Sequence, residues 1–443
     1  MILPFNVVDR IISPRFLALV LALYFAFHIL YFFLPSVPLE SDSLSYYRWA
    51  QENLKSGTLY PSSYNLSINK ECVVAPVYIN LLVVTLSIWN DPKAIFVLNA
   101  VFNISQLLLV FALTRKIFGE LPAAFAAGLY IFYMNNLGLL LMNLTELAFG
   151  VFLLLSIFLY ITRRGAGALL FSGFFLGLAI GVRPTGWALV LALILVMGWK
   201  AFHGTREIRK PILAAFGLCI YILGAGLYTQ HSIGDFVFMS DSGPANLILS
   251  CNDEANGLYS DKIFKRPEFQ IENYKERSKA YLSYSIRWIR QHPFQWISQF
   301  PQKIYSTYIT DDFSVSRLLL QEEWSFNRFV KALRRGELNQ RFNNEPLWFR
   351  VSFLILNIFH QLFYMTLVAV LAMQTFQFIK NKEWKEGTIL LYLYVLIGVL
   401  MTLVGSIGSL RYKYSYMIIA MILCSPLIAQ FIRKHSIPLH PSD

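Results

Sequence analysis

Six ionisable residues stand beside long apolar segments of the sequence, where a charged side chain is costly and is usually kept for function. They are Glu40, Asp42, Glu146, Arg183, Arg411 and Lys413. Acids and bases gathered in such a setting could act on an anionic substrate. The cations would bind a phosphate group, and a carboxylate would take a proton from a second substrate. The surrounding segments must then bring these residues to one place.

Several of these residues also have an ordinary structural explanation. Asp42 precedes a helix-like pattern and could cap that helix. Glu146 could be paired by a neighbouring helix, and Arg411 could be an interfacial anchor beside Tyr412 and Tyr414. Six histidines show no metal-ligand spacing, and we expect them to be loop or packing residues: His203, His231, His292, His360, His435 and His440.

The composition indicates which elements hold these residues. Of the 443 residues, 56% are apolar and only 14% are charged, against about 25% charged in a soluble domain. Apolar runs of about 18 or more residues recur along the chain, and each could cross a hydrocarbon layer of about 30 Å as a helix. The sequence therefore predicts an all-α polytopic membrane protein and makes a soluble globular protein improbable.

The net charge of +12 could suggest nucleic-acid binding, but the distribution of the charges indicates membrane topology instead. Residues 229–347 carry 15 Lys or Arg and 14 Asp or Glu, so this stretch is nearly neutral. The basic excess lies in short connections between apolar runs, which is typical of cytoplasmic loops. We expect these connections and both termini to be cytoplasmic.

Ten crossings satisfy this pattern. We place them at about 16–34, 94–113, 122–141, 146–161, 168–186, 187–202, 211–228, 349–378, 388–410 and 414–432. The first is too long for a cleavable signal peptide, so we expect a retained helix. The apolar segment 73–89 would reverse the orientation of the later basic clusters if it crossed. We expect it to lie along the outer interface or to dip in and return.

The predicted chain has three parts. Residues 1–228 form a membrane module with the first outer loop and the candidate acids, residues 229–347 form a second outer loop, and residues 348–443 form the last crossings. Within the second outer loop, 274–291 and 294–308 have apolar residues at helical spacing and predict amphipathic helices on the membrane surface.

The four cysteines show no metal spacing. Cys219 and Cys424 fall in predicted helices. Cys72 and Cys251 fall in the two outer loops, and a disulfide between them is a hypothesis that an oxidising exterior would allow.

A series of short motifs follows one order along the chain. They are Asp42 with Tyr46, Ala50, Gly57 and Tyr60; Ala75-Pro76-Val77-Tyr78; Leu144-Thr145-Glu146; a Gly-rich helix that ends at Arg183-Pro184; the loop Ser242 to Tyr259; His292-Pro293; and Arg411-Tyr412-Lys413. The set, which covers about residues 36–430, resembles the polyprenyl-phosphate-dependent glycosyltransferases of the GT-C fold. The closest resemblance is to the branch of protein O-mannosyltransferases and bacterial aminoarabinose transferases of lipid A.

The resemblance implies roles for particular residues. Asp42 would be the general base that deprotonates an acceptor hydroxyl, and the sugar would invert at its anomeric carbon. Lys70, Arg183, Arg411 and Lys413 would bind the lipid phosphate, and Tyr78 would donate a hydrogen bond to it. Glu146 would orient a substrate, or hold Arg183 or Lys70.

The resemblance implies no required metal, because the donor carries a monophosphate ester and the two acids have no His or Cys companion. If a divalent ion were present, Glu40, Asp42 and Glu146 would be the first ligands to test. The implied partners are a polyprenyl-phosphate sugar, the bilayer, and a glycolipid, glycan or protein acceptor. The implied location is a bacterial inner membrane, with the site facing outward.

Two other functions remain open from the sequence. A transporter or flippase would also be polytopic and rich in buried charge, but it is expected to show internal symmetry or helices interrupted in the middle of the membrane. A lipid-linked glycan polymerase or ligase would share the donor type and would need a diphosphate-lipid site.

Overall fold

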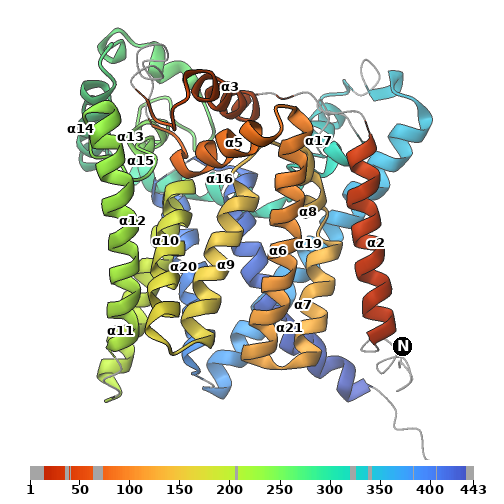
Figure 1. Ribbon diagram of the computed structural model, residues 1–443. Helices are drawn as coiled ribbons and strands as arrows, with labels where there is room; N and C mark the ends of the chain where they lie inside the picture. The colour runs from red at the N-terminus through yellow and green to blue at the C-terminus, as the bar shows by residue number, and fades with distance from the viewer. Residues whose placement is uncertain are drawn as a thin grey trace, which may run out of the picture.

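The computed structural model describes residues 14–34, 39, 41–62, 73–204, 208–319, 326–337, 342–382, 384–405 and 407–435. These residues form helices and short helical turns and contain no strand, so the predicted all-α class is confirmed. The long helices form one bundle, and most of the shorter helices gather at one end of it (Figure 1). We call this end the site end.

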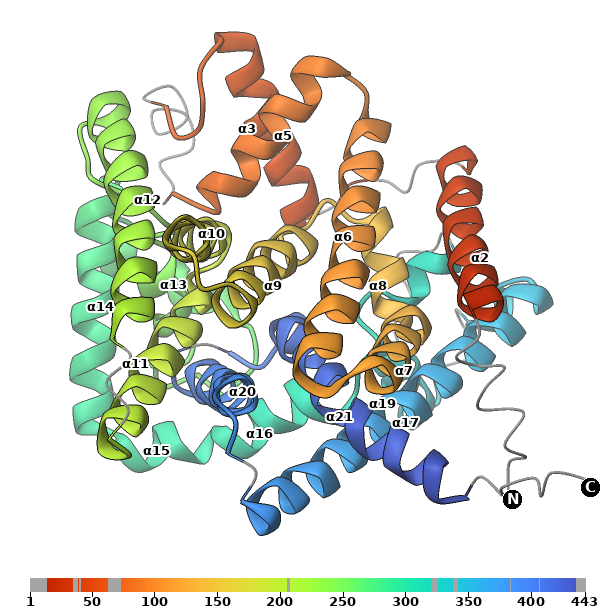
Figure 2. The same ribbon diagram turned by 60° about the horizontal axis from the view of Figure 1, so that its bottom comes forward.

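The bundle is built from the long apolar segments (Figure 2). Its helices are α2 (Pro14–Phe33), α6 (Pro92–Phe118), α7 (Glu120–Phe132), α8 (Met134–Gly138), α9 (Glu146–Thr162), α10 (Ala166–Val182), α11 (Trp187–Phe202), α12 (Arg209–Ile233), α19 (Leu347–Asn381), α20 (Glu386–Gly405) and α21 (Tyr414–His435). The predicted crossing at 122–141 is divided into α7, α8 and a short turn, and each of the other predicted crossings becomes one helix whose ends lie within about five residues of those expected.

Further helices and single turns connect the long helices. The helices are α3 (Ser41–Ser56), α5 (Pro76–Ile88), α13 (Gly243–Ile248), α14 (Tyr274–Gln291), α15 (Pro293–Ser298), α16 (Phe300–Ile304) and α17 (Phe326–Arg334). The turns used below are η1 (Leu139–Leu141), η5 (Tyr305–Ile309) and η8 (Leu410–Lys413). The second predicted amphipathic helix, 294–308, is divided into α15, α16 and η5.

The expected count of ten crossings is not confirmed. Six helices among the described residues are long and apolar enough to cross a membrane, and a seventh span is possible if α7 and the segment 134–141 are counted as one bent pair. The two members of this pair meet at 55°. Helices α9 and α10 are apolar but have only 17 residues each, although they run inside the bundle (Figure 1).

The apolar segment 73–89 forms α5, which lies with α3 at the site end (Figure 1). Its 13 residues extend about 20 Å at 1.5 Å per residue, which is less than the hydrocarbon thickness of about 30 Å. Helix α5 is therefore too short to cross as a single span, which fits the expectation drawn from the charge pattern.

Helix α21 is at the centre of the bundle. Every residue from 413 to 425 is buried, because this helix is apolar on all sides and is covered by its neighbours. Close packing elsewhere depends on small residues. An added Cβ at Gly173 of α10 would lie 1.7 Å from the carbonyl oxygen of Ala214 in α12, so only glycine permits this approach. A rigid bundle of this kind can hold side chains at helix ends in fixed positions.

Candidate functional site

Arg411 lies at the centre of a cluster of four charged side chains, which we call the ion cluster: Asp42, Glu146, Arg183 and Arg411. Its Nη1 donates a hydrogen bond to Oδ2 of Asp42 at 2.6 Å, and its Nε donates to Oε1 of Glu146 at 2.8 Å. Nη1 of Arg183 donates to the same Oε1 of Glu146 at 2.6 Å. The structure thus brings together four of the seven predicted site residues.

Four separate elements supply the ion cluster. Asp42 is the second residue of α3, and Glu146 is the first residue of α9. Arg183 follows the last residue of α10, and Arg411 lies in the turn η8 just before α21. Asp42 and Arg411 are 369 positions apart in the chain, so only the folded bundle can join them.

The two acids differ sharply in access to solvent. The Asp42 side chain is 52% exposed, whereas that of Glu146 is 1% exposed. Asp42 lies inside the first turn of α3 and pairs with a distant arginine, so capping is not the interaction that the structure shows for its carboxylate. An accessible carboxylate can meet a substrate, while a buried carboxylate between two arginines can only hold them in place.

The side of the cluster away from Asp42 is closed. Arg183 also donates to Oγ1 of Thr145 at 3.3 Å, and its guanidinium lies 5.8 Å from the centre of the Tyr412 ring. The void that adjoins Glu146, Arg183 and Arg411 has a volume of about 10 Å³, near the space of one water molecule. Among the described residues of the cluster, Asp42 is thus the most accessible, and Arg411 and Arg183 are partly exposed beside it.

Tyr78 does not face this open side. It is completely buried, and its hydroxyl donates to Oδ1 of Asn143 at 2.7 Å. The amide of Asn143 in turn donates to the carbonyl oxygen of Ser43 at 2.8 Å, next to Asp42. Burial raises the pKa of the adjacent Tyr46 to about 12, so this phenol stays neutral beside the cluster. Tyr78 therefore supports the first turn of α3 instead of presenting a donor to solvent.

Lys413 lies apart from the ion cluster. Its side chain is fully buried, and its Nζ donates to the carbonyl oxygens of Thr307, at 2.6 Å, and Thr310. It also lies 3.3 Å from Oδ1 of Asp311. The seventh predicted site residue, Lys70, lies outside the described residues, as does Glu40, which the sequence suggests only as a possible metal ligand.

Asp311 and His360 form a buried pair that the sequence did not predict. Asp311 is completely buried, and its Oδ2 lies 3.4 Å from Nε2 of His360. Burial opposes ionisation of Asp311, but the charges of Lys413 and His360 outweigh it and lower the pKa of this carboxyl. His360 is thus more than the packing residue that its spacing suggested. Only the adjacent pair of acids in the sequence could have drawn attention to Asp311.

The predicted disulfide is not formed by Cys251 in this structure. Cys251 is a buried free thiol, and burial raises its pKa. Its proposed partner, Cys72, lies outside the described residues.

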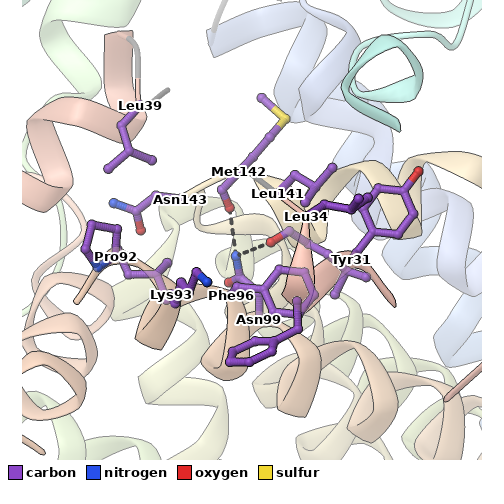
Figure 3. Close-up of a pocket in the computed structure, with 13 residues that line it drawn as sticks. Tyr31, Leu34, Leu39, Pro92, Lys93, Phe96, Asn99, Leu141, Met142 and Asn143 are labelled. Atoms are coloured by element: carbon purple, nitrogen blue, oxygen red, sulfur yellow. Dashed lines mark hydrogen bonds between the residues drawn. The ribbon is translucent and has the colours of Figure 1, made fainter. Parts of the chain in front are cut away.

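A cavity of about 180 Å³ lies beside the ion cluster, between the site ends of α2 and α6 and the segment 139–143 (Figure 3). Most of its walls are apolar, and Asn143, which supports α3, is one of its lining residues. Asn99 also lines it and donates to the carbonyl oxygen of Met142 at 2.8 Å. The ammonium of Lys93 lies 5.5 Å from the Phe32 ring at this cavity. Apolar walls with one cation suit an apolar chain with an anionic head group.

Comparisons with known proteins agree with this architecture. Residues 74–226 match the family model for dolichyl-phosphate-mannose-protein mannosyltransferases, a segment that contains Glu146 and Arg183. No curated protein sequence matches the chain.

Solved structures of an archaeal enzyme have a similar fold. The apo oligosaccharyltransferase of Archaeoglobus fulgidus has a TM-score of 0.51 and 12% identity, over 95% of this chain and 51% of that chain. The same protein with a tethered acceptor peptide has a TM-score of 0.51 and 14% identity, over 95% and 50%. Its complex with Zn and sulfate has a TM-score of 0.51 and 14% identity, over 94% and 49%.

The present chain spans about half the length of the oligosaccharyltransferase. At this identity the likeness establishes the fold, and it confirms the fold that the ordered motifs implied. The chain has the GT-C fold of the archaeal oligosaccharyltransferase, and its residues 74–226 are similar to the dolichyl-phosphate-mannose-protein mannosyltransferases.

Proposed function

We propose that the chain is an integral membrane glycosyltransferase that moves a hexosyl or pentosyl group from a polyprenyl-phosphate carrier to an acceptor hydroxyl. The observation that carries this proposal is the ion cluster, in which one accessible carboxylate, Asp42, is paired with an arginine that a buried Glu146 holds. A base beside a fixed cation is what transfer from a phosphate ester requires.

The reaction would be a single in-line displacement. Asp42 takes the proton of the acceptor hydroxyl as its oxygen forms a bond to the anomeric carbon. The bond from that carbon to the phosphate oxygen breaks, and polyprenyl phosphate leaves as a stable anion, so no acid is needed to protonate it. Arg411 and Arg183 offset the charge that develops on the leaving group. One displacement inverts the anomeric carbon, whereas retention would need a second carboxylate as nucleophile.

Glu146 serves this reaction indirectly. Because it is buried and accepts hydrogen bonds from both arginines, it is a positioning residue and does not touch the substrate. Lys413 contacts Thr307 and Asp311, outside the ion cluster. Among the described residues, Arg411 and Arg183 are therefore the cations of the cluster that would bind the phosphate.

The two described acids of the cluster do not by themselves form a site for a divalent ion. A zinc complex is known for the oligosaccharyltransferase. In this chain the facing oxygens of Asp42 and Glu146 are both bound to Arg411. Within the described ranges no group of three or more His, Cys, Asp or Glu side chains could hold a metal ion. Two carboxylates bridged by a guanidinium are too few ligands for a zinc or calcium site.

We infer that the site end faces the exterior, which is the periplasm if the membrane is a bacterial inner membrane. The connections between α6 and α7, α9 and α10, and α19 and α20 lie at the opposite end of the bundle (Figure 1). They carry or adjoin a set of basic residues: Arg115, Lys116, Arg163, Arg164, Lys380, Lys382 and Lys385. The positive-inside rule assigns that end to the cytoplasm.

The cavity beside the ion cluster supports a lipid substrate. We assign it to the part of the donor chain that lies nearest the phosphate. Its lining residue Phe32 also packs against Trp89, with 6.2 Å between the ring centres, next to the C-terminal end of α5. The acceptor is a glycolipid, a glycan or a protein.

The break between α7 and α8 does not favour a transporter. Broken helices of transporters present free backbone and polar groups to a substrate. Here the amide of Asn136 donates to the carbonyl oxygen of Tyr130, and Oδ1 of Asn135 accepts from the hydroxyl of Ser314 at 2.8 Å. These groups are bound within the protein.

Mass spectrometry of cell-envelope glycans from cells with and without the gene tests the proposed activity. We expect one sugar increment to be missing when the gene is absent and restored when it is returned. Identical glycan profiles in both strains would contradict the proposal.

A further inference from the structure

We propose that Lys413 is a positioning residue, which fixes the turn η8 against the segment 305–311 so that Arg411 reaches Asp42 and Glu146. This inference goes beyond the phosphate-binding role that the motif implied for Lys413. It rests on the proposed function only where a lipid phosphate is used as the probe.

The contacts and burial of Lys413 leave its ammonium no open side for a substrate. A lysine ammonium has three donor hydrogens and no acceptor. Three oxygens surround it: the carbonyl oxygens of Thr307 and Thr310 and Oδ1 of Asp311. The side chain is 0% exposed, and Nζ also lies 4.8 Å from the centre of the Tyr364 ring. A phosphate could bind this ammonium only after one of these oxygens had left.

Asp311 depends on the same contact. Its side chain is 0% exposed, and Lys413 and His360 lie within ion-pair distance of it, with the Tyr133 hydroxyl as a further neighbour. Removing one partner of a buried ion pair leaves an uncompensated charge, which is strongly unfavourable. The pair between Lys413 and Asp311 therefore holds the start of α21 and the segment 305–311 together.

The geometry of η8 explains how this pair acts on Arg411. A 3-10 helix has three residues per turn, so Arg411 and Lys413, two positions apart, point to different sides of the turn. The backbone just before η8 is also hydrogen-bonded to two other segments. The Ser409 amide donates to Oγ1 of Thr307 at 3.1 Å, and the Gly408 amide donates to the carbonyl oxygen of Gly257 at 2.8 Å. Lys413 anchors one side of the turn while Arg411 extends from the other.

A double-mutant cycle tests this inference. The dissociation constant of C55 polyprenyl phosphate is measured in detergent micelles for wild type, Lys413→Met, Arg411→Ala and the double variant. We expect the dissociation constant of each single variant to be about tenfold or more above that of wild type. The dissociation constant of the double variant should lie within about twofold of that of Arg411→Ala. If the two losses multiply, Lys413 contacts the phosphate itself and the inference is wrong.

Lys303→Met is the matched control. Lys303 is another fully buried lysine at the site end, and its ammonium donates to the carbonyl oxygen of Leu403 at 2.9 Å, away from Asp311. We expect this variant to lose thermal stability but to keep the wild-type dissociation constant. If it weakens binding as much as Lys413→Met does, general destabilisation explains both variants and the positioning role fails.

A second readout needs no ligand. The rate at which phenylglyoxal modifies Arg411 is followed by peptide mass spectrometry in wild type, Lys413→Met and Lys303→Met. We expect at least a threefold higher rate only in Lys413→Met, because Arg411 loses its fixed position between the two acids. An unchanged rate would overturn the inference. If wild type fails to bind C55 polyprenyl phosphate, the proposed function is contradicted, while this rate still decides the role of Lys413.

The single variant could fail to fold because Asp311 would remain buried without its partner. The double variant Asp311→Asn/Lys413→Met removes both charges and is then used in its place, since removing both members of a buried pair is tolerated better than removing one. Its Arg411 should react with phenylglyoxal at the same raised rate.

Discussion

At the scale of single residues, Arg411 is shared by two carboxylates with different surroundings. The buried Glu146 fixes the guanidinium, and the half-exposed Asp42 is left with one oxygen that Arg411 does not occupy. This arrangement separates the group that holds the cation from the group that can take a proton.

Arg411→Ala should weaken the binding of C55 polyprenyl phosphate by about tenfold or more, which corresponds to about 1.4 kcal/mol. The reason is the loss of the charge that would meet the leaving phosphate. Arg115→Ala is the matched control, because Arg115 lies in an exposed ion pair with Glu120 at 2.7 Å. Titration in detergent micelles measures both variants. Equal affinity of Arg411→Ala and wild type would count against the phosphate role.

Glu146→Gln should lower the free energy of unfolding by about 3–5 kcal/mol, because two arginines would lose their buried anionic acceptor. Glu120→Gln changes the same chemical group in an exposed pair and should cost at most about 1 kcal/mol. Denaturant unfolding in detergent compares the two. Similar losses in both variants would show that Glu146 does not hold the cluster.

The residue types and their order predicted four members of the ion cluster, because charge beside apolar sequence is rare and conspicuous. The partner of Lys413 could not be predicted. Asp311 lies 102 positions away, within residues 229–347, and no periodic pattern marks it as buried. The motif therefore led to a phosphate role for a lysine that the structure has fully paired.

At the scale of elements, the apolar pattern located α11 at Trp187–Phe202 and the amphipathic pattern located α14 at Tyr274–Gln291, with the same bounds as the structure. The break at Tyr133 was missed because neither Gly nor Pro marks it. Tyr133 adopts an extended conformation there, and the following turn is held by tertiary contacts of Asn135 and Asn136. Contacts between distant segments, not local sequence, decide such breaks.

Leu141→Trp, in the segment that lines the cavity, should fill the space proposed for the donor chain. We expect the affinities for C55 polyprenyl phosphate and for farnesyl phosphate both to fall about tenfold, or by about 1.4 kcal/mol, because both lipids have the prenyl units next to the phosphate. Leu191→Trp on the exposed face of α11 adds the same side chain outside the cavity and should bind both lipids as wild type does. Unchanged affinity in Leu141→Trp would remove this cavity from the lipid site.

At the scale of the whole molecule, the bundle places the ion cluster at one end and the basic connections at the other. The sequence predicted this separation because charge bias depends only on composition and order. The predicted crossings at 146–161 and 168–186 form the bundle helices α9 and α10, but each has only 17 residues and is shorter than an ordinary span, so the count of ten crossings is not confirmed.

A cysteine label tests the orientation. Asn90 is exposed in the connection between α5 and α6 at the site end, and Gly165 is exposed in the connection between α9 and α10 at the other end. A membrane-impermeant maleimide should react with Asn90→Cys in intact cells and with Gly165→Cys only after permeabilisation. The reverse pattern would place the site in the cytoplasm. Native cysteines are replaced by alanine in both variants.

The central claim is that Asp42 takes the proton from the acceptor. The most direct measurement is mass spectrometry of envelope glycans from a deletion strain that carries wild type, Asp42→Asn or an empty vector, at equal protein levels in the membrane. The account predicts the sugar increment with wild type only, although Asp42→Asn still binds C55 polyprenyl phosphate. A wild-type increment in the Asp42→Asn strain would contradict it.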